Sequence, residues 1–142
     1  MTAGNEDVVV EVEAASDSYE AALAAGDVEA LVRAFWRSEA AVRIGDDEEL
    51  FGWDAIAEHR RATGRVRVRR RVVRREITGF GADLATVHIV ADYPGERRTG
   101  RQTQVWVRTP EGWRVAQAHV SWPLRSICAA PSGAEIRTKE NR

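Results

Sequence analysis

The stretch that decides the fold is Gly100–Ser121, which reads GRQTQVWVRTPEGWRVAQAHVS. Two runs rich in Val and Trp flank the tetrapeptide TPEG at residues 109–112, with Pro and Gly at the second and fourth positions of a turn. Such runs joined by such a turn are typical of a β-hairpin. The sequence therefore predicts a long hairpin, and the rest of the chain can be placed around it.

The two faces of this hairpin differ in chemistry, because side chains alternate along a strand. With symmetric pairing about the turn, one face carries Gln102, Gln104, Trp106, Val115, Gln117, His119 and Ser121. The other face is apolar and carries Val105, Val107, Ala116, Ala118 and Val120. The first face is either the wall of a polar pocket or a half-buried polar surface. A bulge at the turn would shift this register.

Length and charge limit the possible classes of protein. The 142 residues suffice for one domain with a core and are too few for two. A formal net charge of −1 gives no overall field that would attract nucleic acid or an anionic membrane. Cys128 is the only cysteine, and the three histidines have no metal-ligand spacing, so no metal site is expected. Without a signal-peptide pattern or a membrane-length apolar run, we expect a cytoplasmic protein with no membrane partner.

A first helix is predicted over Asp7–Ala25, where apolar residues recur at helical spacing, and Gly26 would end it. Asp27 would then cap a second, shorter helix. Tyr19 lies on the apolar stripe of the first helix. If it is buried, its hydroxyl needs a polar partner inside the fold. The alternative is a tyrosine whose tip reaches solvent or a backbone carbonyl.

A short strand is predicted over Ala40–Gly45, with Arg43 in its middle. An arginine in that position lies on an outer face or is buried with an anionic partner. Leu50–Gly52 favours a second short strand. A third helix would begin at an Asp54 cap and end at Gly64, and Arg60 in it could share the buried face.

Two charged runs have simple interpretations. Asp46–Glu49 is interpreted as a solvated turn, since it lacks the ligand pattern of a calcium loop. Arg65–Glu76, RVRVRRRVVRRE, could bind nucleic acid. However, it has no interleaved aromatic for base stacking, and the alternation of Val66, Val68 and Val72 fits a strand with an outward basic face. We therefore predict an outer or interface strand and no nucleic-acid partner.

The order of elements predicts the fold class. Four strands separated by turns follow the helices instead of alternating with them. This order predicts an α+β fold, with N-terminal helices packed on a curved antiparallel sheet. We place a single domain at residues 1–128 and a mobile C-terminal tail at 129–142.

Several pieces of the chain resemble a known family. They are EVEAASDSYEAALAAGDVEAL from residue 11, FW at 35–36, VRIG at 42–45, and the hairpin arms GRQTQVWVR and GWRVAQAHVS. In this order they resemble the NTF2-like, or SnoaL-like, cone superfamily, and more narrowly its oxalurate-catabolism branch, which includes the AtzH-type decarboxylases of N-carboxylated ureas. The resemblance covers roughly residues 8–121. The Arg-rich run and the segment after Trp122 depart from it.

The resemblance implies one cone pocket per subunit and a homodimer formed through the convex sheet face, with Val105, Val107, Ala116 and Ala118 as its contacts. It implies Tyr19 and Arg43 as the catalytic pair. The substrate-binding candidates are Trp36, Arg60, Gln104, Trp106, His119 and Ser121.

The expected activity is decarboxylation or hydrolysis of a small anionic urea derivative, without metal or cofactor. Arg43 would hold a carboxylate, and either Tyr19 or His119 would deliver a proton. The alternative is an NTF2-like module that binds an anionic ligand or assembles with partners and does no chemistry, because the fold hosts both.

Overall fold

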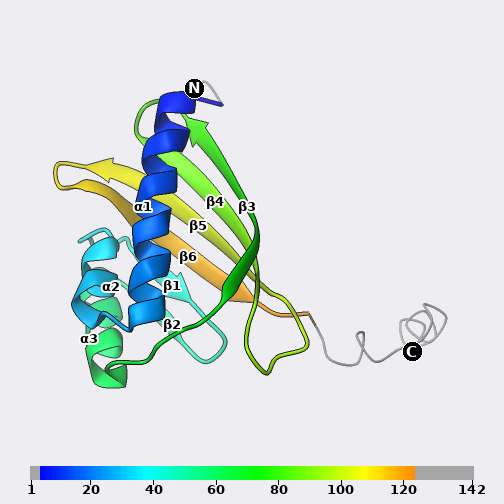
Figure 1. Cartoon of the computed structure of the whole chain (residues 1–142). Helices are drawn as coiled ribbons and strands as arrows, with labels where there is room; N and C mark the ends of the chain where they lie inside the picture. Colours follow the sequence, from blue (N-terminus) through cyan, green and yellow to red (C-terminus); the bar gives the residue numbers. More distant parts are fainter. Residues whose placement is uncertain (1–3, 124–142) are drawn as a thin grey trace, which may run out of the picture.

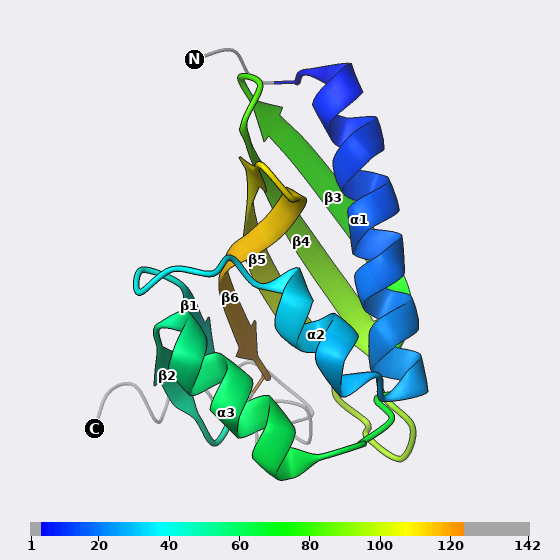
Figure 2. The same cartoon turned by 90° about the vertical axis from the view of Figure 1, so that its left-hand side faces the viewer.

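A computed structural model of the protein describes residues 4–123. Within this range the elements are α1 (Glu6–Ala25), α2 (Val28–Ala34), β1 (Val42–Ile44), β2 (Glu49–Phe51), α3 (Trp53–Thr63), β3 (Arg71–Phe80), β4 (Leu84–Asp92), β5 (Gly100–Thr109) and β6 (Gly112–Ser121). The helices cover one face of a curved sheet, as Figures 1 and 2 show. This arrangement confirms the predicted α+β cone. The predicted mobile tail lies outside the described residues.

The sheet has the strand order β2-β1-β6-β5-β4-β3. Strands β3 to β6 form the predicted antiparallel meander. Strand β1 runs parallel to β6, so Arg43 lies beside Ala118 in the middle of the hairpin's second arm. The two short strands thus extend the sheet next to the hairpin and bring Arg43 to its inner face.

The hairpin contains a bulge that changes which residues share a face. Trp106 pairs with Val115, but Val105 pairs with Gln117, so Ala116 is the extra residue. Beyond the bulge Ala118 lies opposite Gln104, on the inner face. The residues displaced to the outer face are Gln117, His119 and Ser121, all exposed. The symmetric register predicted from the sequence is therefore wrong for the part of β6 that follows Ala116.

The predicted dimer surface changes for the same reason. Val105 and Val107 lie half-buried on the outer face, which no helix covers within the described part of the chain (Figure 2). Ala116 and Ala118 are instead buried within the single chain. Homodimer formation stays a prediction, with a contact surface that lacks these two alanines.

The helix ends follow local chemistry. The Asp27 carboxylate accepts from the backbone N–H of Ala30 at 3.1 Å, which is the predicted cap of α2. Helix α3 begins at Trp53 after Gly52, so the predicted Asp54 cap is wrong. Gly64 ends α3, as predicted. None of the helices in the described range is long and apolar enough to cross a membrane.

The core lies between α1 and the inner face of the sheet. Tyr19 is 3% exposed and belongs to this core, so its predicted place on a buried stripe is confirmed. Its ring meets Phe35 and Trp106 edge-on, with centroid distances of 6.4 and 6.3 Å. Aromatic packing on two sides therefore fixes the position of the phenol.

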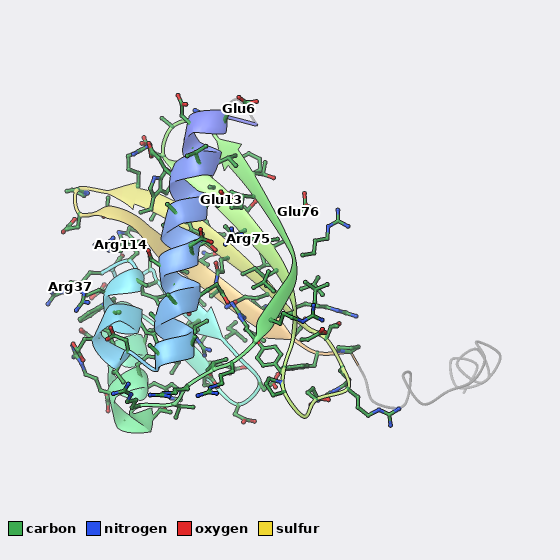
Figure 3. All side chains as sticks on the ribbon, in the orientation of Figure 1. Glu6, Glu13, Arg37, Arg75, Glu76 and Arg114 are labelled. Atoms are coloured by element: carbon green, nitrogen blue, oxygen red, sulfur yellow. The ribbon has the colours of Figure 1, made fainter. Side chains whose placement is uncertain are left out.

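The Arg-rich run differs from the prediction of one outward basic face. Strand β3 begins only at Arg71, and two of the arginines turn toward α1. Arg70 donates to both carboxylate oxygens of Glu20, and Arg75 donates to Asp17 at 2.7 Å. Figure 3 shows Arg75 reaching from β3 toward α1. These two arginines therefore hold the helix against the sheet.

Candidate active site

A cavity of about 210 Å³ opens between α1, α3 and the inner face of the sheet. Tyr19 from α1, Arg43 from β1, Arg60 from α3 and Gln102 from β5 line it. The other lining residues are Leu23, Gly45, Asp46, Glu48, Val68, Arg70, Tyr93, Val120 and Trp122. The structure thus brings the predicted pair Tyr19 and Arg43, and the predicted Arg60, into one site.

The Tyr19 hydroxyl lies against cations. Arg60 Nη2 donates to the Tyr19 oxygen at 3.0 Å. A hydroxyl that accepts from a guanidinium keeps its own O–H available as a donor. A cation in this position also offsets the negative charge that develops on the oxygen when the proton leaves. This geometry suits a proton donor.

Arg43 is a largely buried cation close to a second cation, Arg60. Burial lowers the pKa of its guanidinium; Tyr19 acts in the opposite direction, and the charge of Arg60 lowers this pKa further. Arg43 forms an ion pair with Glu48, whose side chain is 18% exposed. Two neighbouring guanidinium groups repel each other, so a bound anion would stabilise both.

Four buried side-chain atoms in the described range have no hydrogen-bond partner: Arg43 Nε, Arg60 Nε, Gln102 Oε1 and Gln104 Nε2. Three of them belong to residues that line the cavity. Folded proteins pair nearly all of their buried polar atoms, because an unpaired one costs about 1–3 kcal/mol. The unpaired atoms therefore point to a ligand that supplies the missing partners.

A third arginine, Arg70, also lines the cavity, and unlike Arg60 it has a carboxylate partner. Burial disfavours the charged form of Arg70, but hydrogen bonds and attraction from Glu20 outweigh it and raise the pKa of Arg70. Arg70 also donates to the Tyr93 hydroxyl at 3.1 Å. By contrast, no carboxylate among residues 4–123 forms an ion pair with Arg60.

Other predicted site residues lie elsewhere. His119 and Ser121 are on the outer face, so their predicted place in the pocket is wrong, and the bulge is the reason. Trp36 lines a separate cavity of about 360 Å³ beside Trp53, so it is not part of the site around Tyr19.

Trp106 and Gln104 lie one layer behind the cavity. The Trp106 Nε1–H donates to Gln104 Oε1 at 2.9 Å, and both side chains are buried. Trp106 packs on the ring of Tyr19, and it lines a neighbouring cavity of about 330 Å³. Trp106 therefore packs behind Tyr19, and neither Trp106 nor Gln104 lines the cavity that Tyr19 and Arg43 share.

Sequence reasoning missed Glu48, Arg70 and Tyr93 as parts of this site, and it placed Gln102 on the polar face of the hairpin without giving it a role. The signal for Glu48 was its position in the turn that follows the strand of Arg43. A turn there brings the chain back alongside β1, so the Glu48 carboxylate can reach Arg43. No local signal identified Arg70, since its partner Glu20 is 50 positions away in the sequence.

A family model supplies the identification, since the model described as AtzH-like matches residues 1–125. The chain belongs to the AtzH-like family. No curated protein matches it.

Solved structures show the fold that this chain shares. A protein of unknown function from Pectobacterium atrosepticum is 38% identical, with a TM-score of 0.81, over 86% of this chain and 95% of that one. A cystatin-like fold protein from Burkholderia xenovorans is 37% identical, with a TM-score of 0.79, over 86% and 96%. An NTF2-like superfamily protein from Salmonella enterica is 22% identical, with a TM-score of 0.70, over 87% and 96%, and shows the shared fold alone. The AtzH-like chain therefore has the NTF2-like cone.

Proposed function

We propose that this AtzH-like protein decarboxylates a small N-carboxylated urea, using its own side chains. The observation that carries the proposal is the Tyr19 hydroxyl beside two guanidinium groups, Arg43 and Arg60, in a cavity of about 210 Å³. Pockets for drug-sized ligands usually measure about 300–1,000 Å³. The smaller volume favours a substrate of few atoms, in keeping with the family resemblance to decarboxylases of N-carboxylated ureas.

Binding would rest on the two guanidinium groups. Each offers N–H donors in a fixed fork that matches a carboxylate, and each has an unpaired buried Nε. A carboxylate at this point would also relieve the repulsion between Arg43 and Arg60. Glu48, which now pairs with Arg43, must share that guanidinium with the substrate or move aside.

The chemical step would be proton transfer followed by bond cleavage. Tyr19 gives its proton to the carbamate nitrogen, the C–N bond breaks with its electron pair going to nitrogen, and the carboxylate leaves as carbon dioxide. The resulting phenolate regains a proton from water. Where the substrate has two carboxylates, Arg43 is better placed on the one that stays. The leaving carboxylate loses its charge, so holding it would stabilise the substrate more than the transition state.

The competing function is an anion-binding module without chemistry, and the same cavity geometry fits it. One experiment separates the two. N-carboxyurea is added to the purified protein, binding is measured by calorimetry, and carbon dioxide release is compared with the spontaneous rate. We expect saturable acceleration. Saturable binding without acceleration would support the module, and absence of binding would reject an N-carboxylated urea as the ligand.

A further inference from the structure

We propose that Gln102 is a specificity residue that recognises the N–H groups of a ureido substrate. This proposal rests on the proposed function, because it assigns a role toward the same class of ligand in the same cavity. It goes further by saying which part of the ligand is selected and by which atom.

Gln102 sits in the inner wall of the site. It lies on β5 between Val120 of β6 and Ile89 of β4, and it is only 5% exposed. Its Oε1 is buried and lacks a partner among the described residues. An unpaired amide oxygen at this depth needs a hydrogen-bond donor.

Gln104 offers an internal comparison, since it lies two residues along the same face of β5. Its Oε1 accepts from Trp106 Nε1 at 2.9 Å, which fixes the amide as part of the core. Gln102 has no such bond to an indole, and it lines the cavity. Of these two buried amides, only Gln102 offers its oxygen to a ligand.

The other side chains of the cavity are poorly suited to recognise N–H groups, and this leaves that recognition to Gln102. Arg43 and Arg60 are donors only, so they can bind a carboxylate but cannot recognise an N–H group. Glu48 is engaged with Arg43, and Asp46 is exposed to water. A buried acceptor beside two cations is complementary to a molecule that carries an anion at one end and N–H groups at the other. A ureido carboxylate has this pattern, and a plain keto acid does not.

The test uses two ligands with the same skeleton and charge, N-carbamoylglycine and levulinate. They differ only in that CH₂ and CH₃ of levulinate replace the NH and NH₂ of the ureido group. We expect the wild-type protein to bind N-carbamoylglycine about 10- to 100-fold more tightly than levulinate. This range corresponds to making one buried hydrogen bond instead of leaving the acceptor unpaired. This ratio tests the proposal without any substitution.

Gln102→Leu should remove the preference by weakening N-carbamoylglycine alone, with levulinate affinity unchanged within about twofold. If Gln102→Leu does not fold, the same measurements are made on Gln102→Met, a more flexible replacement. Equal wild-type affinity for the two ligands, or a variant that weakens both equally, would overturn the role of Gln102 while leaving carboxylate binding by Arg43 intact. Absence of N-carbamoylglycine binding would overturn this proposal, whereas the proposed function is decided separately by binding and carbon dioxide release with N-carboxyurea.

Discussion

The two tyrosines of the chain allow a matched test of the proton donor, because each hydroxyl accepts from an arginine in the same cavity. Tyr19 accepts from Arg60 at 3.0 Å, and Tyr93 accepts from Arg70 at 3.1 Å. Replacing either one by Phe removes one oxygen and keeps the ring. Tyr19 accepts from Arg60, the cavity arginine that has no ion pair among residues 4–123, so only Tyr19→Phe should affect the chemical step.

The expected sizes follow from these contacts. Each variant loses one hydrogen bond from a guanidinium, a cost of about 1–2 kcal/mol in the free energy of unfolding. For a domain of this length that lowers the melting temperature by about 3–8 °C, and by similar amounts in both variants. The retained ring keeps the edge contacts of Tyr19 with Phe35 and Trp106. Loss of a general acid should in addition reduce turnover by about 10²–10⁴-fold in Tyr19→Phe.

The assay follows carbon dioxide release at saturating substrate, with ligand affinity and melting temperature measured on the same preparations. Tyr19→Phe should keep its affinity within a fewfold, and Tyr93→Phe should keep its turnover within a fewfold. Full turnover in Tyr19→Phe would refute the assignment. Because His119 lies on the outer face, the assignment would then pass to Tyr93, whose hydroxyl also belongs to the cavity.

Four further predictions concern charge and assembly. Arg43→Lys should weaken binding of a ureido carboxylate by at least about tenfold in calorimetry, because an ammonium lacks the forked geometry; unchanged affinity would contradict the clamp. Glu48→Gln should tighten binding of the same anion by about tenfold, since it removes a competing charge; weaker binding would mean that Glu48 positions the arginine. Glu20→Gln should lower the free energy of unfolding by about 2 kcal/mol in urea denaturation, whereas Glu29→Gln, which breaks an exposed pair, should leave the denaturation midpoint nearly unchanged; equal effects of the two changes would show that the buried pair adds no stability. Light scattering should give a dimer that Val105→Asp converts to a monomer, and a monomeric wild type would refute the interface.

The sequence predicted the hairpin for physical reasons, and it singled out Tyr19 and Arg43 as polar groups on apolar elements. Their pairing in one site was an expectation from the family resemblance. A Pro-Gly turn between Val-rich runs leaves few alternatives, and a polar group on an apolar stripe has to be explained. The bulge could not be predicted, because Ala116 carries no signature of the kind that glycine gives to some bulges. One inserted residue then moved His119 and Ser121 to the other face, since strand side chains have a period of two.

The Arg-rich run illustrates the other limit. Its charge was evident, but the direction of each side chain depends on partners far away in the sequence. Arg70 and Arg75 bind carboxylates of α1 that lie 50 and 58 positions earlier. Alternation alone predicted an outward face, because it cannot show that a helix carrying Glu20 and Asp17 lies across that part of the sheet.

The distribution of charge in the cavity is itself an argument for an anionic ligand, independent of the family. Arg70 is neutralised by Glu20 and Arg43 by Glu48, while Arg60, in the described range, has only the phenol of Tyr19 as a side-chain partner. Arg60 therefore carries a charge that no ion pair in the described range offsets, and Asp46, the remaining carboxylate of the lining, is exposed to water. A buried charge without a partner lowers stability, and the charge of Arg60 adds to burial, the main cause, in lowering the pKa of Arg43. A scaffold that only needed a packed core would gain by losing Arg60, whereas a site that captures a carboxylate gains by keeping it.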